Sequence, residues 1–157
     1  MTDFEITEKA KALLGGMALE VANPSLRRVF ITVAPGDLAA AVTALRDHLG
    51  FHYLATISGV DDKDDFELLY HFANKHACLN VRTRIPKAAP RIASITPIIP
   101  GAILYEREIQ DMFGIIVENI PDARSLILPD DWPAENFPLR KDWKFERPEE
   151  KIPGGKS

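Results

Sequence analysis

Three segments of the chain carry apolar residues at the three- and four-residue spacing of an amphipathic helix. They cover residues 6–14, 38–49 and 102–113, and the second shows the pattern most clearly. Gly50 and Gly114 directly follow the last two segments, at the position where helices commonly end in a left-handed conformation. The pattern therefore predicts three helices, the last two closed by glycine.

Five further segments are rich in the β-branched and aromatic residues that favour strands. Residues 19–22 and 28–33 flank an Asn-Pro-Ser turn and predict a hairpin. Residues 51–60, 66–72 and 77–85 follow one another without an intervening helix, so they predict an antiparallel meander. The sequence therefore predicts an α+β fold, in which a mainly antiparallel sheet packs against helices.

The composition changes after Val117. Residues 121–157 contain six of the twelve prolines, together with both tryptophans and two phenylalanines. Frequent prolines prevent long helices and remove donors from a β-ladder. We therefore divide the chain into an α+β domain, residues 1–120, and an extended, proline-rich C-terminal interaction tail, residues 121–157. We expect residues 126–128 to cover the domain's own sheet and residues 132–147 to contact another protein.

Length and charge narrow the classes of function. The 157 residues correspond to one average domain. The formal net charge of −4 argues against a nucleic-acid binder, because affinity for phosphate backbones depends on an excess of Lys and Arg. No stretch reaches the ~20 apolar residues needed to cross a bilayer, and residues 1–5 lack the profile of a secretion signal. We therefore expect a cytoplasmic domain that binds no nucleic acid.

Few side chains suggest chemistry of their own. Cys78 is the only cysteine, which excludes an iron–sulfur site built from this chain's thiolates alone. His71, His76 and Cys78 are close in sequence, but their spacing matches no common metal site. The acidic residues at 61–65 lack the glycine and glutamate of a calcium loop, so we expect a solvated turn. We expect no cofactor, no metal and no catalytic residue here; the alternative is a small independent enzyme that uses His71 or His76 with an acidic partner.

The densest charged cluster lies on the third predicted helix and consists of Glu106, Arg107, Glu108 and Asp111. Arg107 and Asp111 are four residues apart, and side chains at this spacing are neighbours on one helix face. One interpretation is a solvated face with a weak ion pair. The other is an interface or a buried ionic network, because a second charged cluster lies in the tail at residues 138–143.

Four blocks of the sequence resemble a known family. They are Glu-Arg-Glu-x-x-Asp-Met-Phe-Gly-Ile at 106–115, Pro-Asp-x-Arg at 121–124, Leu-Pro-Asp-Asp-Trp at 128–132 and Pro-Leu-Arg-Lys-Asp-Trp at 138–143. In content and order they resemble the 30 kDa subunit family of respiratory complex I. The insertion at residues 133–137 is similar to the small homologous subunit of energy-converting, membrane-bound nickel–iron (NiFe) hydrogenases.

The resemblance implies a non-catalytic structural subunit in the hydrophilic arm of a membrane-bound, ion-translocating redox complex. The complex would be a complex I-like NADH/quinone-type dehydrogenase or an energy-converting NiFe hydrogenase. The chain would brace a large catalytic subunit of the 49 kDa or NiFe-hydrogenase-large type and a cluster-bearing small subunit. Those partners would hold the iron–sulfur clusters and, in a hydrogenase, the NiFe centre.

The resemblance also implies a place in the cell and a contact surface. The chain would lie peripherally on the cytoplasmic side of the cell membrane and would touch the membrane only through the complex. We expect its subunit interface to include the helix cluster and the tail residues Glu106, Arg107, Glu108, Asp111, Trp132, Phe137, Arg140, Lys141, Asp142 and Trp143.

Overall fold

A computed structural model describes residues 1–144 of the chain. Phe145 and Arg147, which belong to the segment predicted to contact another protein, lie outside the described residues. The elements, in chain order, are α1 (Asp3–Leu14), the 3-10 turn η1 (Gly15–Met17), β1 (Ala18–Ser25), β2 (Arg28–Val33), η2 (Pro35–Asp37), α2 (Leu38–Leu49), β3 (Tyr53–Asp62), β4 (Asp65–Ala73), β5 (Cys78–Pro86), β6 (Arg91–Ala93), α3 (Ala102–Phe113) and β7 (Ile116–Glu118).

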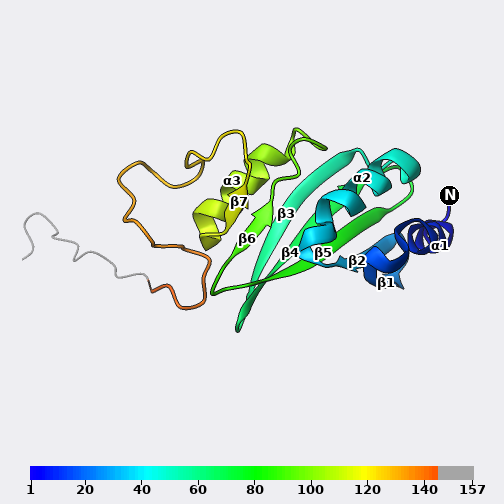
Figure 1. The fold of residues 1–157 in the computed structure, drawn as a ribbon, viewed down its shortest axis with the longest axis horizontal. Coiled ribbons are helices and arrows are strands. Elements are labelled where there is room, and N and C mark those ends of the chain that lie inside the picture. Colours follow the sequence, from blue (N-terminus) through cyan, green and yellow to red (C-terminus); the bar gives the residue numbers. More distant parts are fainter. Residues whose placement is uncertain (145–157) are drawn as a thin grey trace, which may run out of the picture.

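The main sheet has five strands in the order β1-β2-β5-β4-β3. The β1–β2 hairpin and the β3–β4–β5 meander are antiparallel, which confirms the predicted α+β fold. The sequence pattern did not predict two parallel pairings, β2 with β5 and β6 with β7. Figure 1 shows α2 lying over the sheet, α1 beside β1 and β2, and α3 with the β6–β7 pair on the β3 side.

Helices cover one face of this sheet. Along β4, Phe66, Leu68, Tyr70 and Phe72 are buried, while the residues between them are only half-buried. This alternation follows from the strand period of two, which sends successive side chains to opposite faces. The buried side chains join the inward faces of α1, α2 and α3 in one apolar core. None of the helices within residues 1–144 is long and apolar enough to cross a membrane.

The helix boundaries follow local sequence signals. Gly50 and Gly114 adopt left-handed φ angles of 73° and 68° and end α2 and α3 as predicted. The first helix begins at Asp3, three residues before the predicted start. The reason is a capping box, in which the Thr2 hydroxyl accepts from the Glu5 N–H and the Glu5 carboxylate accepts from the Thr2 N–H.

The ring of Phe113 at the end of α3 comes very close to the backbone of β3, and this contact positions α3 against the sheet. The ring of Phe113 packs directly on Gly59 of β3, where an added Cβ would lie 2.5 Å from Phe113 Cε2. The same ring meets Phe66 edge-on, with centroids 5.7 Å apart. Only glycine fits at position 59, so this contact fixes the C-terminal end of α3 over the end of β3 and places the segment that follows.

Candidate partner-binding surface

Glu106 is the buried member of the charged cluster on α3. Its carboxylate accepts hydrogen bonds from Ser94 Oγ at 2.7 Å and from the Ile95 N–H at 2.7 Å, and Ser94 Oγ also lies 2.7 Å from Thr96 Oγ1. Burial raises the pKa of the Glu106 carboxyl, although these hydrogen bonds oppose the shift. Glu106 therefore holds residues 94–96 against α3 from inside the domain.

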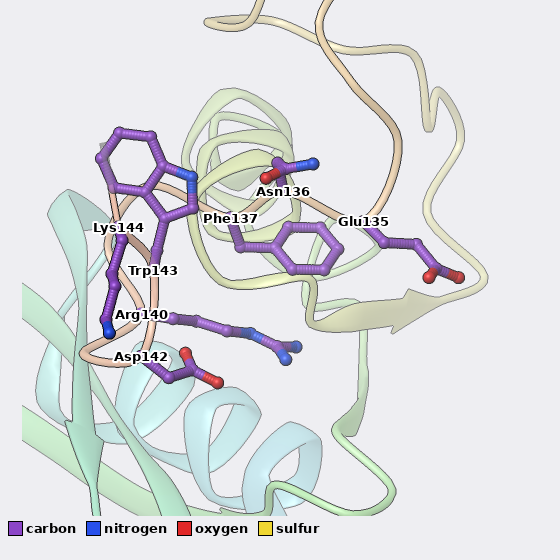
Figure 2. A pocket seen from close by; sticks show the side chains of 7 residues that line it. All are labelled: Glu135, Asn136, Phe137, Arg140, Asp142, Trp143 and Lys144. Atoms are coloured by element: carbon purple, nitrogen blue, oxygen red, sulfur yellow. The ribbon is translucent and has the colours of Figure 1, made fainter. Parts of the chain in front are cut away.

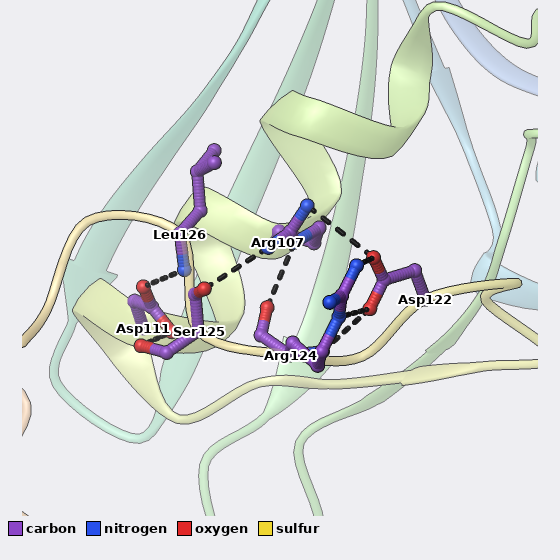
Figure 3. Close-up of polar contacts among 6 residues, drawn as sticks. All are labelled: Arg107, Asp111, Asp122, Arg124, Ser125 and Leu126. Atoms are coloured by element: carbon purple, nitrogen blue, oxygen red, sulfur yellow. Dashed lines mark hydrogen bonds and ion pairs between the residues drawn. The ribbon is translucent and has the colours of Figure 1, made fainter. Parts of the chain in front are cut away.

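Arg107 binds the segment that follows β7. Its Nε donates to the Arg124 carbonyl at 2.7 Å, and Nη2 donates to the Ser125 carbonyl at 3.0 Å. Nη1 also lies 3.6 Å from Asp122, which forms a closer ion pair with Arg124 at 2.6 Å. The hydrogen bonds from Arg124 hold the pKa of Asp122 well below its usual range. Figure 3 shows these contacts converging on one side of α3.

Asp111 holds the next part of the same segment. Its carboxylate accepts the N–H groups of Leu126 and Ile127 at 2.8 Å each and of Leu128 at 3.2 Å, and it accepts the Ser125 hydroxyl at 2.9 Å (Figure 3). Burial opposes ionisation here, but the backbone N–H groups outweigh it and lower the pKa of Asp111. A carboxylate with this many donors ties three consecutive residues to the end of α3.

The segment held by Asp111 does not cover the sheet, so the prediction for residues 126–128 is wrong. Its backbone turns toward α3, because three successive N–H groups point at one carboxylate. The side chains of Leu126 and Ile127 therefore face outward, with 39% and 54% of their surface exposed.

The charged side chains of α3 do not pair with one another as their four-residue spacing suggested. Arg107 and Asp111 bind backbone and side-chain groups of residues 122–128 and not each other. Glu108 has no hydrogen bond or ion pair within residues 1–144, and it lines a groove between α3 and β3. The cluster is thus neither a plain solvated face nor a closed ionic network.

The tail returns to the domain through Phe137 and Arg140. The ring of Phe137 lies on Gly114, where a side chain would clash with it. The Arg140 Nε donates to the Phe113 carbonyl at 2.6 Å. Its guanidinium lies 5.2 Å from the Phe66 ring centre and 4.5 Å from that of Phe137, within the range of cation–π attraction. Arg140 therefore joins the tail to the C-terminal end of α3.

Two backbone contacts extend this attachment. The Leu139 N–H donates to the Met112 carbonyl at 3.1 Å, and the Lys141 N–H donates to Asp61 Oδ2 at 2.9 Å. Asp61 also forms an ion pair with Lys87. Burial disfavours the Asp61 charge, but Lys87 and the Lys141 N–H outweigh it and lower the Asp61 pKa. The prediction of a solvated acidic turn is therefore wrong for Asp61, which points inward at the end of β3 and is 4% exposed.

The remaining tail residues of the predicted interface lie on a small turn structure. The Trp132 and Trp143 rings are 6.3 Å apart at an interplanar angle of 33°, and Trp132 Nε1 donates to the Asn136 carbonyl at 2.8 Å. Asp142 directly precedes Trp143 in the chain. Figure 2 shows the shallow pocket that this turn structure forms, lined by Glu135, Asn136, Phe137, Arg140, Asp142, Trp143 and Lys144.

Within residues 1–144, His71 and His76 form no hydrogen bond or ion pair with an acidic side chain. His71 Nδ1 lies 2.6 Å from Asn80 Oδ1, and Nε2 lies 2.9 Å from Ser58 Oγ, so both ring nitrogens face neutral groups. His76 lies in the turn before β5, with its Nδ1 3.4 Å from the N-terminal amino group. Within residues 1–144 no three His, Cys, Asp or Glu side chains are grouped as a metal site would require.

The sequence and the fold both match one family. The family described as respiratory-chain NADH dehydrogenase, 30 Kd subunit, matches residues 31–149, which include α3 and the tail blocks. The chain belongs to this family. The resemblance drawn from the four sequence blocks is confirmed.

Individual relatives come from several kinds of redox complex. The chain is 38% identical over 104 residues to a subunit of the F(420)H(2) dehydrogenase of Methanosarcina mazei, covering 64% of this chain and 65% of that protein. It is 48% identical over 64 residues to formate hydrogenlyase subunit 5 of Escherichia coli, covering 41% of this chain and 11% of that protein. The chain thus matches just under two thirds of the first relative and about a tenth of the second.

One solved structure carries the same fold across nearly the whole chain. It is that of the membrane-bound sulfane sulfur reductase (MBS), an archaeal respiratory membrane complex. The superposition has a TM-score of 0.80 at 25% sequence identity and covers 90% of this 30 kDa-family chain and 85% of the other.

Sequence reasoning pointed to α3 and the tail but missed several residues that make contacts between distant parts of the chain. Asp61, Gly114 and Ser125 contact residues far away in the chain, so no local spacing rule could reveal them. The exposed Leu139 was part of a recognised sequence block, although its position beside α3 was not foreseen.

Proposed function

We propose that this 30 kDa-family protein is a structural subunit of a membrane-bound, ion-translocating redox complex and has no catalytic role of its own. The observation that carries the proposal is the family match over residues 31–149. The fold shared with a chain of an archaeal respiratory membrane complex supports it further. The complex is of the NADH/quinone type or an energy-converting NiFe hydrogenase, because relatives occur in both a dehydrogenase and a hydrogenlyase.

The redox centres belong to partner subunits in this proposal. Cys78 is the only thiol of the chain, and iron–sulfur clusters are held mainly by sets of cysteine thiolates. We place the clusters, and the NiFe centre of a hydrogenase-type complex, in the partners. The chain holds those subunits in fixed relative positions and lies peripherally on the cytoplasmic side of the membrane.

The proposed main partner is a large subunit of the 49 kDa or NiFe-hydrogenase-large type, beside a cluster-bearing small subunit. The E. coli hydrogenlyase subunit supports a large partner, because the matched segment is only 11% of that polypeptide. A domain like this one is therefore joined covalently to a much longer chain in that relative. The surface offered to the partner comprises the outer side of α3 and the tail, including Glu108, Trp132, Lys141, Asp142 and Trp143.

Affinity purification from the source cells tests this proposal. A tagged chain, released from membranes with a mild detergent, is expected to recover a large subunit and a cluster-bearing subunit, which mass spectrometry identifies. A tagged, unrelated domain of similar size and charge serves as the control. Recovery of the chain alone as a monomer that turns over a substrate by itself would contradict the proposal and favour an independent enzyme.

A further inference from the structure

The two edges of the main sheet differ in how they are protected. β1 carries Glu20 and Pro24 and has two register irregularities, features that discourage strand addition. β3 has no charged residue or proline in residues 53–60, and its one irregularity lies between Leu54 and Thr56. β3 pairs only with β4, and no backbone hydrogen bond from another segment within residues 1–144 reaches its outer edge. An edge strand of this kind is a template for another strand.

A groove of about 260 Å³ runs beside this free edge. Its floor includes Ile109 and Phe113 of α3, and its rim holds the Leu139 side chain, which is 54% exposed. Leu139 stays there because its N–H is bound to the Met112 carbonyl. The groove is lined by Thr56, Ile57, Ser58, Gly59, Glu108, Ile109, Met112, Phe113 and Leu139.

Glu108 is the only charged side chain of this lining, and it has no partner within residues 1–144. The neighbouring acidic groups are different, because Glu106, Asp111 and Asp61 all accept hydrogen bonds from within the chain. A carboxylate without a partner in a groove lined by neutral side chains attracts a cation. The groove therefore fits an occupant that places apolar side chains against Met112 and Leu139 and one basic side chain beside Glu108.

We propose that residues 56–60 of β3 bind an extended segment of a partner subunit as an added strand of the sheet. Main-chain hydrogen bonds to the outer edge of β3 supply affinity, and alternate side chains of the segment enter the groove beside α3. Apolar side chains pack on Met112 and Leu139, and a Lys or Arg pairs with Glu108. This inference rests on the proposed function, because the segment comes from a subunit of the complex.

The charge of the groove favours a partner subunit over a second copy of this chain. Two copies that paired through their β3 edges would bring two unpaired Glu108 carboxylates to one strand pair. Like charges across a pairing edge are destabilising, whereas a basic partner segment is attracted.

Hydrogen exchange tests this inference on the full chain, free and in the affinity-purified complex. Amides of residues 56–60 that point away from β4 are expected to exchange at least about tenfold more slowly in the complex, because strand addition engages them. Glu108→Lys is expected to weaken recovery of the partner by about tenfold or more, since it sets like charges together. Glu20→Lys, the same change on the opposite edge, is the matched control and should bind as wild type.

The possible outcomes separate this inference from the proposed function. A complex in which residues 56–60 exchange as fast as in the free chain overturns strand addition and leaves the proposed function intact. Glu108→Gln removes the charge with little change of shape, so it tests the contact even if the lysine variant fails to fold. If Glu108→Gln binds the partner as tightly as wild type, the proposed Glu108 contact is overturned. Protection that grows with concentration of the free chain identifies a second copy and overturns the inference. Failure to recover any partner overturns both.

Discussion

At the scale of single residues, α3 uses its charged side chains to hold other parts of the same chain. Glu106 binds residues 94–96 from inside, while Arg107 and Asp111 bind the segment after β7. The carboxyls of Glu106 and Asp111 differ in environment, and their pKa values move in opposite directions. The charged cluster on α3 thus holds together the loops of the domain. Glu108 is its one member without a hydrogen bond or ion pair within the part of the chain that the structure describes.

Replacing Arg107 tests the role of its contacts. Arg107→Ala removes two hydrogen bonds and an ion pair from a side chain that is only 13% exposed. We expect the free energy of unfolding to fall by about 1–3 kcal/mol, because the Arg124 and Ser125 carbonyls lose a charged donor. Arg124→Ala is the matched control: this side chain is 84% exposed, and exposed ion pairs contribute about 0–1 kcal/mol. Equal losses in urea unfolding would contradict the account.

The opposite pKa shifts predict opposite pH dependence for two conservative variants. Asp111 has a lowered pKa in the folded state, so its stabilising contribution is present above the unfolded pKa of about 3.9 and is lost as pH falls through the folded value. Glu106 has a raised pKa, so its contribution is present below the unfolded pKa of about 4.3 and is lost as pH rises through the folded value.

Urea unfolding at a series of pH values measures both effects. The stability gap between wild type and Asp111→Asn should shrink as the pH is lowered from 7 through the acid range. The stability of wild type relative to Glu106→Gln should instead rise as the pH is lowered toward 4. If both stability differences are independent of pH, or change in the same direction with pH, the two carboxyls do not have oppositely shifted pKa values.

At the scale of elements, the helices were predicted best and the long-range pairings least. α2 and α3 begin and end where apolar spacing and a following glycine placed them, because both signals are local. The parallel β2–β5 pair joins strands separated by α2, β3 and β4, and no local pattern encodes which strand lies beside which. The same limit applied to the site: spacing suggested an Arg107–Asp111 pair, whereas both residues bind a segment that only the fold brings near.

Residues 121–144 of the tail form no helix or strand and are held in place by contacts with α3 and β4. Phe137 on Gly114 and Arg140 on the Phe113 carbonyl hold it to the domain. We expect Arg140→Ala to lower the free energy of unfolding by about 1–3 kcal/mol, because a charge-assisted hydrogen bond and two ring contacts are lost. Lys144→Ala, at the other end of the same turn, should leave unfolding unchanged.

Hydrogen exchange of the free chain gives a second test of the tail. Amides of Leu139 and Lys141 should be protected in the isolated wild-type chain, since both donate within the domain. The same amides should exchange faster in Arg140→Ala. If they exchange at the unfolded rate in the free wild-type chain and slow only in the complex, the tail is ordered by the partner and not by α3.

At the scale of the whole molecule, the fold brings the candidate partner-binding surface together at one end. α3, the β6–β7 pair and residues 121–144 of the tail lie on the β3 side of the sheet, away from the N-terminal helix (Figure 1). The free edge of β3 and the groove with Glu108 lie at this same end.

The location of metal in the dissociated complex tests the central claim most directly. The affinity-purified complex is separated into this chain and its partners under anaerobic, mildly denaturing conditions, and iron and nickel are measured in each fraction. We expect all of the iron, and any nickel, to follow the partner subunits, with no stoichiometric metal on this chain. One tightly held metal ion or cluster per copy of this chain would contradict its role as a structural subunit without a redox centre.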